Sequence, residues 1–230
     1  MQAQSPARHS ATFLDALGTL IRLEEPWPAL CARLRERHGA AIALADARRA
    51  LLAEMAHYRR NCVFAGDRDA LYALRLECAA IVRSELAPTL DALSVEELAP
   101  TLLDALHFEP FPDAVPTLRR LRAAGRRLVV VSNWDVSLHD VLDATGLAPL
   151  LDGVVCSAQV GTSKPDPAIF EAALGLAGAA AAQAVHVGDS LAEDVAGARA
   201  AGIEAVLLVR GADAPRPPAG VRTVASLREL

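Results

Sequence analysis

Six polar residues that lie far apart in the chain stand at the ends of short apolar runs or a few residues beyond them. They are Asp15, Ser132, Asn133, Lys164, Asp189 and Asp194. Three carboxylates gathered at one place repel one another, and a hard divalent cation such as Mg²⁺ is the usual means of neutralising them. A hydroxyl group and an ammonium group beside that cation suit the oxygens of a phosphoryl group. These residues therefore predict metal-assisted chemistry on a phosphorylated small molecule.

Each of these residues also has a structural explanation when it is considered alone. An aspartate such as Asp15 can cap a turn, and Ser190 with Glu193 forms a helix capping box that involves no catalysis. That capping box leaves Asp189 and Asp194 unexplained. The structural explanation is adequate for any single residue, but it does not account for polar groups at the ends of successive strands.

Lys164 is the only lysine in the chain, because the other 22 of the 23 basic residues are arginine. Such a bias indicates that arginine is accepted wherever a general positive charge is enough. The remaining lysine marks a place where a compact ammonium group on a flexible stem is useful. Chance can also leave one lysine anywhere, so this observation only directs attention to Lys164.

The elements that would position these residues are strands that alternate with helices. Strands are predicted at 11–14, 128–131, 153–156, 184–187, 205–209 and 221–224. Continuous apolar runs separated by helices are typical of a parallel sheet that is covered on both faces, which is the α/β class. In an open parallel sheet, ligands bind beyond the carboxyl ends of the strands. We therefore expect the six polar residues to converge at one edge of the sheet.

A purely helical pattern occupies the stretch from about residue 24 to residue 107. Gly39 is a predicted helix stop, Asp67 a predicted N-cap, and Ser94 with Glu97 a predicted capping box. Pro100 is expected to kink or split the helix that follows this box. We predict a discontinuous α/β core at 11–22 and 108–230, a helical insertion at 23–107, and a flexible extension at 1–10. A proline-rich loop is predicted at 211–220.

The composition of the chain excludes several classes of function. The chain has 230 residues and a net charge of −5, which gives no electrostatic reason to expect a nucleic acid or an anionic membrane as partner. No apolar run approaches the ~20 residues that cross a bilayer, and the N-terminus lacks the apolar block of a secretory signal. The four cysteines are scattered and are expected to be buried, reduced thiols. We expect a cytoplasmic monomer or homodimer.

The polar motifs resemble, in order and spacing, those of the haloacid dehalogenase-like hydrolase superfamily over essentially residues 12 to 210. The segment from Phe13 to Leu20 resembles the first motif, which reads D-x-D-G-T in phosphatase members. Ser132 with Asn133 resembles the second, Lys164 with Pro165 the third, and Gly188-Asp189 through Asp194 the fourth. The helical insertion is similar to the α-helical C1 cap of members such as the haloacid dehalogenase-like hydrolase domain-containing proteins.

This resemblance implies a Rossmann-like core with an inserted cap, and it implies roles for individual residues. Asp15 is the implied nucleophile, which forms an aspartyl-phosphate with help from Lys164. The implied Mg²⁺ ligands are the carboxylates of Asp15 and Asp189 and the carbonyl of Leu17, with Asp194 bound directly or through water. The implied substrate-binding residues of the core are Thr19, Ser132, Asn133 and Lys164.

Substrate choice is expected to lie in the cap. The candidate specificity residues are His57, Tyr58, Arg59 and Arg60. Basic residues at a helix C-terminus also complement the helix dipole without any ligand. Trp134 is equally consistent with the mouth of a pocket and with the core, and His186, inside a predicted strand, is expected to be structural.

Leu17 departs from the motif that it occupies, because phosphatase members carry a general acid/base aspartate there. General acid–base catalysis contributes ~10²–10⁴-fold to a rate, so we expect slow turnover or a preference for acyl and aryl phosphates. The change leaves two alternatives open. True 2-haloacid dehalogenases also lack this aspartate, although their fourth motif is rich in serine and asparagine. A catalytically silent member that binds a phosphorylated metabolite would lack it as well.

Overall fold

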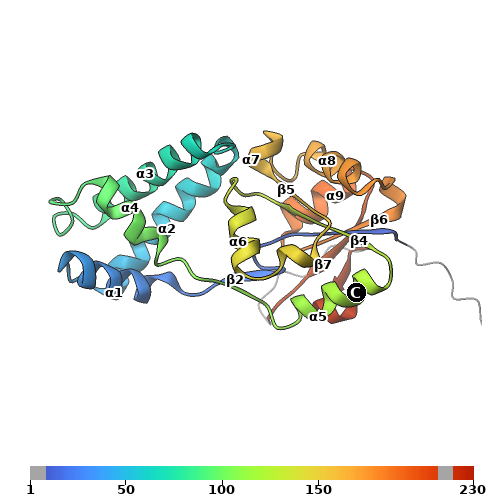
Figure 1. The fold of residues 1–230 in the computed structure, drawn as a ribbon, viewed down its shortest axis with the longest axis horizontal. Coiled ribbons are helices and arrows are strands. Elements are labelled where there is room, and N and C mark those ends of the chain that lie inside the picture. The colour runs from blue at the N-terminus through green and yellow to red at the C-terminus, as the bar shows by residue number, and fades with distance from the viewer. Residues whose placement is uncertain (1–8, 212–219) are drawn as a thin grey trace, which may run out of the picture. The chain divides into compact units, whose positions relative to one another are not determined.

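The computed structural model describes residues 9–211 and 220–230 (Figure 1). Most of the extension predicted at 1–10, and most of the proline-rich loop predicted at 211–220, lie outside these residues. The chain divides into two compact units. One consists of the residues up to Arg22 together with those from Pro110 onward, and the other of Leu23–Glu109. We call them the α/β unit and the helical unit.

Six strands of the α/β unit form one sheet in which every neighbouring pair is parallel. In spatial order they are β5 (Gly153–Cys156), β4 (Arg127–Ser132), β1 (Ala11–Leu14), β6 (Ala184–Gly188), β7 (Glu204–Leu208) and β8 (Arg222–Val224). The central strands β1 and β6 are buried along their whole length, as strands of a doubly covered parallel sheet must be. The predicted α/β class with a Rossmann-like parallel sheet is confirmed.

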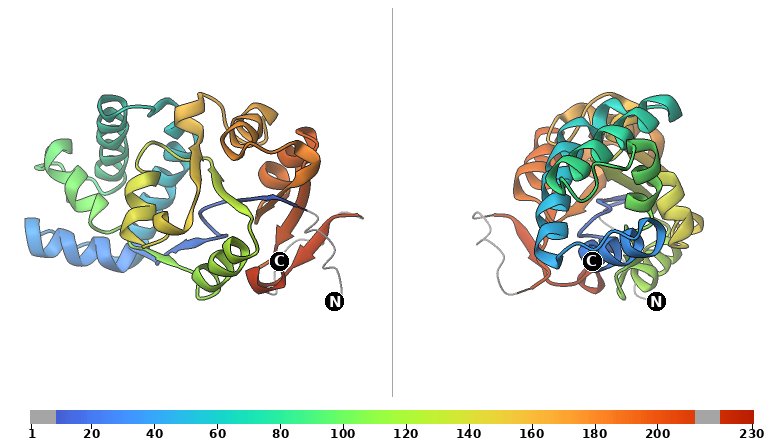
Figure 2. Two further views of the ribbon diagram at one scale, coloured as in Figure 1. Left: turned by 45° about the vertical axis from the view of Figure 1, so that its right-hand side comes forward. Right: turned by 90° about the vertical axis from the view of Figure 1, so that its left-hand side faces the viewer.

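Helices cover both faces of this sheet (Figures 1 and 2). They are α5 (Ala114–Ala123), α6 (Leu138–Ala144), α7 (Ser157–Val160), α8 (Pro167–Ala177) and α9 (Ala196–Ala200). Phe13 of β1 and Val129 of β4 pack with Phe170 of α8 in one buried cluster. Short 3₁₀ turns lie at Ala148–Leu150, Ala181–Gln183 and Leu227–Glu229.

The register of the sheet brings the carboxyl ends of three strands to one edge. Leu14, the last residue of β1, pairs with Val130, two residues before the end of β4, and with Val187, one residue before the end of β6. The chain runs from β4 outward to β5, and then crosses to the other side of β1 for β6, β7 and β8. A ligand crevice forms where the strand order reverses in this way, and here that place is beyond Leu14.

The helical unit consists of α1 (Pro26–His38), α2 (Leu44–Asn61), α3 (Arg68–Glu85) and α4 (Val95–Leu103), with a 3₁₀ turn at Cys62–Phe64. The predicted end signals are present. Gly39 ends α1 in a left-handed conformation, the Asp67 side chain accepts two backbone N–H groups at the start of α3, and Ser94 with Glu97 forms the capping box of α4.

Of the kink or split expected at Pro100, the split is wrong, because α4 continues through this residue to Leu103, and the kink stays a prediction. A proline inside a helix removes one backbone hydrogen bond. Leu98 and Leu102 of the same helix are almost completely buried. The free energy gained by burying these two side chains is larger than the contribution of the one exposed hydrogen bond that is lost, so the helix remains unbroken.

Two short strands that the sequence pattern did not predict connect the units. β2 (Ile21–Leu23) and β3 (Phe108–Pro110) pair with each other as a separate two-stranded sheet. Beyond the strands, the Phe111 N–H donates to the Leu20 carbonyl at 2.9 Å, and the Glu24 N–H donates to the His107 carbonyl at 2.9 Å. The chain therefore enters and leaves the helical unit through adjacent segments.

Two expectations about the chain as a whole can be compared with the structure. None of the helices in the described part of the chain combines the length and the apolar character that a bilayer crossing requires. All four cysteines are free, and three of them are buried. The expected burial is wrong for Cys31, which is half-buried because it lies beside the apolar stripe formed by Leu30 and Leu34 on α1.

Candidate active site

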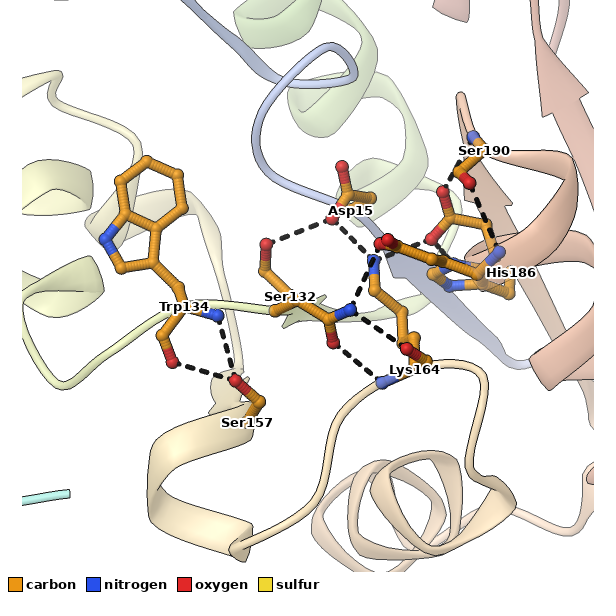
Figure 3. A network of polar contacts seen from close by, with 10 residues as sticks. Asp15, Ser132, Trp134, Ser157, Lys164, His186 and Ser190 are labelled. Carbon is orange, nitrogen blue, oxygen red and sulfur yellow. Dashed lines mark hydrogen bonds and ion pairs between the residues drawn. The ribbon is translucent and has the colours of Figure 1, made fainter. Parts of the chain in front are cut away.

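Polar side chains from several strand ends meet beyond the carboxyl end of β1 (Figure 3). The Lys164 ammonium donates to Asp15 Oδ1 at 2.6 Å and to Asp194 Oδ1 at 2.6 Å. The Ser132 hydroxyl donates to the same oxygen of Asp15 at 3.0 Å. All four side chains are almost completely buried. The carboxyl-edge location expected from the sequence therefore holds for these residues.

Three carboxylates lie within reach of a single cation at this place. Oxygens of Asp15, Asp189 and Asp194 lie within 4.8 Å of one another. Burial raises the pKa of Asp15 to about 6, with the neighbouring Asp194 adding to the rise and Lys164 opposing it. Burial and Asp194 likewise raise the pKa of Asp189. Carboxyl groups whose ionisation is opposed by burial and by a neighbouring carboxylate fit a hard divalent cation, which would favour their charged forms.

Lys164 and Asp194 are both buried, and each favours the charged form of the other. Burial disfavours the charged form of Lys164, but Asp15 and Asp194 raise its pKa above the ordinary value, so it remains an ammonium ion. Burial also disfavours ionisation of Asp194, but Lys164 and a hydrogen bond from His186 keep the pKa of Asp194 far below its usual range. One buried ammonium group therefore faces three acidic groups.

Glycine is required at two positions where backbone and carboxylate approach closely. Gly18 has φ +85°, and a Cβ atom there would lie 2.0 Å from Asp189 Oδ2. A Cβ atom on Gly188 would lie 2.1 Å from Asp194 Cγ. Side chains at either position would displace the acidic residues. The turn after β1 closes through the Gly18 N–H, which donates to the Ile21 carbonyl at 2.8 Å.

Asn133 was predicted to bind substrate. In the structure its side chain contacts the main chain of Lys164. Its Oδ1 accepts the Lys164 N–H at 2.7 Å, and its Nδ2 donates to the Lys164 carbonyl at 3.0 Å. Nδ2 also donates to Glu193 Oε2 at 3.0 Å. The observed contacts give Asn133 a part in holding Lys164, and direct substrate binding by this residue stays a prediction.

Asp194 lies in a π-helical turn at Leu191–Val195, where the sequence predicted an ordinary α-helical start. The Ser190 hydroxyl accepts the Glu193 N–H at 3.2 Å, and Asp194 Oδ2 accepts the Ser190 N–H at 3.0 Å. The Glu193 side chain does not complete the predicted capping box, because it accepts from Asn133. Single π-turns are frequent at functional sites, and this one directs the Asp194 carboxylate toward Lys164.

His186 is a member of the site that the sequence interpretation assigned to the core. It lies in β6, is fully buried, and places Nε2 2.8 Å from Asp194 Oδ1 (Figure 3). Its ring packs edge-on against Phe170, with the centroids 4.9 Å apart. The position of His186 in the strand could have indicated this role. Alternate residues of a strand share a face, so His186 lies on the same face of β6 as Gly188, which is the face that Asp194 approaches.

Other predicted site residues have more limited contacts. Thr19 is fully buried, and its Oγ1 has no hydrogen-bond partner among the described residues. The Trp134 side chain is largely buried, which places it mainly in the core, and the backbone N–H of Trp134 donates to Ser157 Oγ at 3.0 Å. A substrate contact by Thr19 stays a prediction.

The four candidate specificity residues lie near the C-terminal end of α2 in the helical unit: His57, Tyr58, Arg59 and Arg60. Nε2 of His57 lies 2.9 Å from Glu77 Oε2, while Arg59 and Arg60 are exposed. The specificity role of this group stays a prediction.

Asp113 immediately precedes α5, where an aspartate commonly caps a helix, but its side chain makes no capping bond. Its two carboxylate oxygens accept from the Arg210 guanidinium at 2.8 and 3.1 Å, and Oδ2 also accepts from Ser226 Oγ at 2.7 Å. Arg210 in turn donates to the Thr19 carbonyl at 2.9 Å. A charged partner competes successfully with the backbone N–H groups of the helix, because charge-assisted hydrogen bonds are stronger. Asp113 thus links the loop after β1 to the C-terminal segment.

A pocket of about 330 Å³ lies beside the acidic cluster in the α/β unit. Its walls are mostly apolar and are formed by Gly18, Phe111, Asp189, Leu191, Leu207, Leu208, Val209 and Arg210. The Arg210 guanidinium lies over the Phe111 ring, 3.8 Å from its centroid. Asp189 is therefore the member of the acidic cluster that lines this pocket.

Comparison with known proteins adds evidence that is independent of this geometry. A family model described as a haloacid dehalogenase-like hydrolase matches residues 10–202. Haloacid dehalogenase-like hydrolase domain-containing protein 3 of Homo sapiens is 40% identical over 128 residues, which are 54% of this chain and 51% of the human protein. Glyceraldehyde 3-phosphate phosphatase of Methanopyrus kandleri is 38% identical over 106 residues, which are 46% of each chain.

A solved structure resembles nearly the whole chain. The crystal structure of a HAD phosphatase from Thermococcus onnurineus matches with a TM-score of 0.65 and 28% identity, covering 96% of this chain and 95% of that one. The chain spans about half the length of the curated relatives it matches.

Proposed function

The chain belongs to the haloacid dehalogenase-like hydrolases, and on that premise we propose that it is a Mg²⁺-dependent phosphohydrolase that acts on a small phosphorylated metabolite. One observation carries the proposal. The buried Asp15 carboxylate contacts both Lys164 and Ser132, and it lies within 4.8 Å of two further carboxylates. Relatives that are named phosphatases support the reaction class. The expected cytoplasmic location stays a prediction.

The acidic cluster fits the proposed cation by the chemistry of its donors. Asp15, Asp189 and Asp194 would hold the ion, with the Leu17 carbonyl as a further ligand. When bound, Mg²⁺ supplies positive charge that neutralises phosphoryl oxygens as the bond to the leaving group breaks. The raised pKa values of Asp15 and Asp189 support this assignment, because burial and the neighbouring Asp194 disfavour their ionised forms and a bound cation would favour them.

The proposed reaction has two steps, and both occur at phosphorus. In the first, an Asp15 oxygen bonds to phosphorus, the bond between phosphorus and the leaving oxygen breaks, and an aspartyl-phosphate forms. In the second, a water oxygen bonds to phosphorus, the bond between phosphorus and the Asp15 oxygen breaks, and inorganic phosphate and the Asp15 carboxylate are released, with the proton of the attacking water passing to solvent water. Lys164 and Ser132 already contact Asp15, so they are placed to donate to phosphoryl oxygens and to stabilise their charge.

Leu17 sets the proposed limits of this activity. Its side chain cannot protonate a leaving oxygen or accept a proton from water. A leaving group that departs readily as an anion does not need the first of these functions. We therefore propose that acyl phosphates and aryl phosphates are better substrates than alkyl phosphates, and that hydrolysis of the aspartyl-phosphate is slow.

Phosphate release tests the proposal. The purified protein is incubated with acetyl phosphate, p-nitrophenyl phosphate and an alkyl phosphate, with Mg²⁺ or with a chelator, beside the Asp15→Asn protein. We expect Mg²⁺-dependent release that is fastest on acetyl phosphate and is abolished in Asp15→Asn. Chloride release from a 2-chloroacid that does not need Mg²⁺ would favour a dehalogenase instead. A folded protein that releases neither product would favour a silent binding member.

A further inference from the structure

We infer that His186 is a positioning residue for the cation site, which it serves by anchoring the carboxylate of Asp194. The inference rests on the cation site of the proposed function, but it concerns a residue to which that function assigns no part. His186 Nε2 lies 2.8 Å from Asp194 Oδ1, and both side chains are buried, with 0% and 2% of their surfaces exposed. Water therefore cannot replace the histidine as a donor.

The hydrogen-bond pattern identifies which ring nitrogen acts as the donor. An ionised carboxylate only accepts hydrogen bonds, so Nε2 must carry the hydrogen in this pair. Nδ1 is buried without a partner among the described residues, so the contact with Asp194 is the only hydrogen bond that fixes the ring in this part of the chain.

The backbone of His186 is held more firmly than that of any loop residue at the site. It lies in a strand between two others, where it pairs with Phe13 of β1 and with Ala205 of β7. Phe170 contacts the edge of its ring. A donor that is fixed in this way gives Asp194 a rigid reference point, although Asp194 itself lies in an irregular π-helical turn.

His186 also gives Asp194 a hydrogen-bond donor in addition to Lys164. The Lys164 ammonium divides its hydrogens between Asp15 and Asp194, and in the proposed reaction it must also serve phosphoryl oxygens. Nε2 of His186 donates to Asp194 alone. Asp194 therefore stays in place while Lys164 changes partners, and its second oxygen remains oriented by the Ser190 N–H at 3.0 Å. Residues that support a metal ligand typically change metal affinity 10–100-fold when mutated.

Two amide variants of matched chemistry test the inference. In H186Q the amide nitrogen reaches the position of Nε2, whereas in H186N it falls one bond short. The dissociation constant for Mg²⁺ is measured by calorimetry without substrate, first on the unmodified protein. The increase in melting temperature on adding Mg²⁺ is measured on the same samples, because ligand binding stabilises the folded state by an amount set by its affinity.

We expect about 10- to 100-fold weaker Mg²⁺ binding in H186N and a smaller rise in its melting temperature. H186Q should bind within a few-fold of the unmodified protein. A purely structural role would lower the melting temperature with and without Mg²⁺ alike and leave the dissociation constant unchanged. If H186N does not fold, H186M replaces it as a variant that fills the space without a donor.

The failures of the two proposals differ. If the unmodified protein does not bind Mg²⁺, the proposed cation site is wrong. If it binds Mg²⁺ and a folded variant without the donor binds equally well, or if H186Q loses affinity as severely as H186N, the anchoring role of His186 is wrong and the proposed function is unaffected.

Discussion

The side-chain amide of Asn133 pairs with both polar groups of the Lys164 main chain. Oδ1 accepts the Lys164 N–H at 2.7 Å, and Nδ2 donates to the Lys164 carbonyl at 3.0 Å. The residue after β4 thereby fixes the backbone from which the buried ammonium group reaches Asp15. A side chain that ends in two contacts of 2.6 Å cannot tolerate a large movement of its own backbone.

Asn133→Ala should lower kcat on acetyl phosphate by about 10²-fold, because a displacement of about 1 Å in a catalytic group has an effect of this order. Steady-state phosphate release checks the prediction, and melting temperature shows whether the fold is kept. Ser137→Ala, in the same loop, leaves the pairing intact and is the control. If the Asn133→Ala protein is folded and its kcat is unchanged, Asn133 does not contribute to catalysis.

Leu17→Asp should increase the rate on an alkyl phosphate by about 10²–10⁴-fold, because the new carboxyl group can protonate a poor leaving group. The rate on acetyl phosphate should rise less, since its leaving group departs as a carboxylate. The ratio of the two rates is the measurement. Leu17→Asn is the control, because it has a similar shape and no proton to transfer. An equal increase in both variants would contradict the general-acid explanation.

Asp15→Asn should change how stability depends on pH when no metal is present. The pKa of Asp15 is raised from 3.8 to about 6, chiefly by burial. The folded state then binds the proton more tightly, so the stability that Asp15 contributes is present below pH 3.8 and is lost as pH rises through about 6. We expect the variant to gain about 3 kcal/mol relative to the unmodified protein between pH 4 and pH 7. Urea unfolding in a chelator measures this difference, and parallel pH profiles would contradict it.

Asp113→Asn should destabilise the α/β unit by about 1.5–3 kcal/mol at neutral pH, because it removes the charge that pairs with Arg210. Burial opposes ionisation of Asp113, but hydrogen bonds from Arg210 and Ser226 lower its pKa below 3.8. Its contribution is therefore present above pH 3.8 and disappears as pH falls through the lowered pKa.

Urea unfolding at several pH values measures the effect of Asp113→Asn, and the difference from the unmodified protein should shrink in acid. Asp143→Asn is the matched control, since Asp143 is exposed and its loss should change stability by less than about 0.5 kcal/mol. A pH-independent difference would show that the Asp113 charge is not the cause.

The strands, and the edge of the sheet at which their polar residues lie, could be predicted because both depend on the pattern of apolar and polar residues along short segments of the chain. The predicted bounds of β1 and β5 agree with the structure, since each is an apolar run followed by a polar residue or a turn. The closeness of Asp15 to Lys164 follows from the general rule for strand ends in parallel sheets.

Features that depend on distant partners could not be predicted in the same way. Asp113 resembles a helix cap locally, and its actual partner Arg210 lies 97 residues further along the chain. In the π-turn around Asp194, the aspartate contacts Lys164 and His186. The α-helical spacing of 3.6 residues that is sought in a sequence does not reveal such a turn. His186 resembles a core residue because it is one, and only its contact with Asp194 distinguishes it.

The pairing of β2 with β3 has a consequence for how this architecture can diversify. The chain leaves the α/β unit and returns to it through neighbouring strands, so the inserted segment occupies the place of an ordinary hairpin loop. A hairpin can hold a turn of two residues or a folded module without any change in the order of the large sheet. Insertions of different size and fold can therefore occupy this place while the carboxyl edge of the large sheet keeps its arrangement.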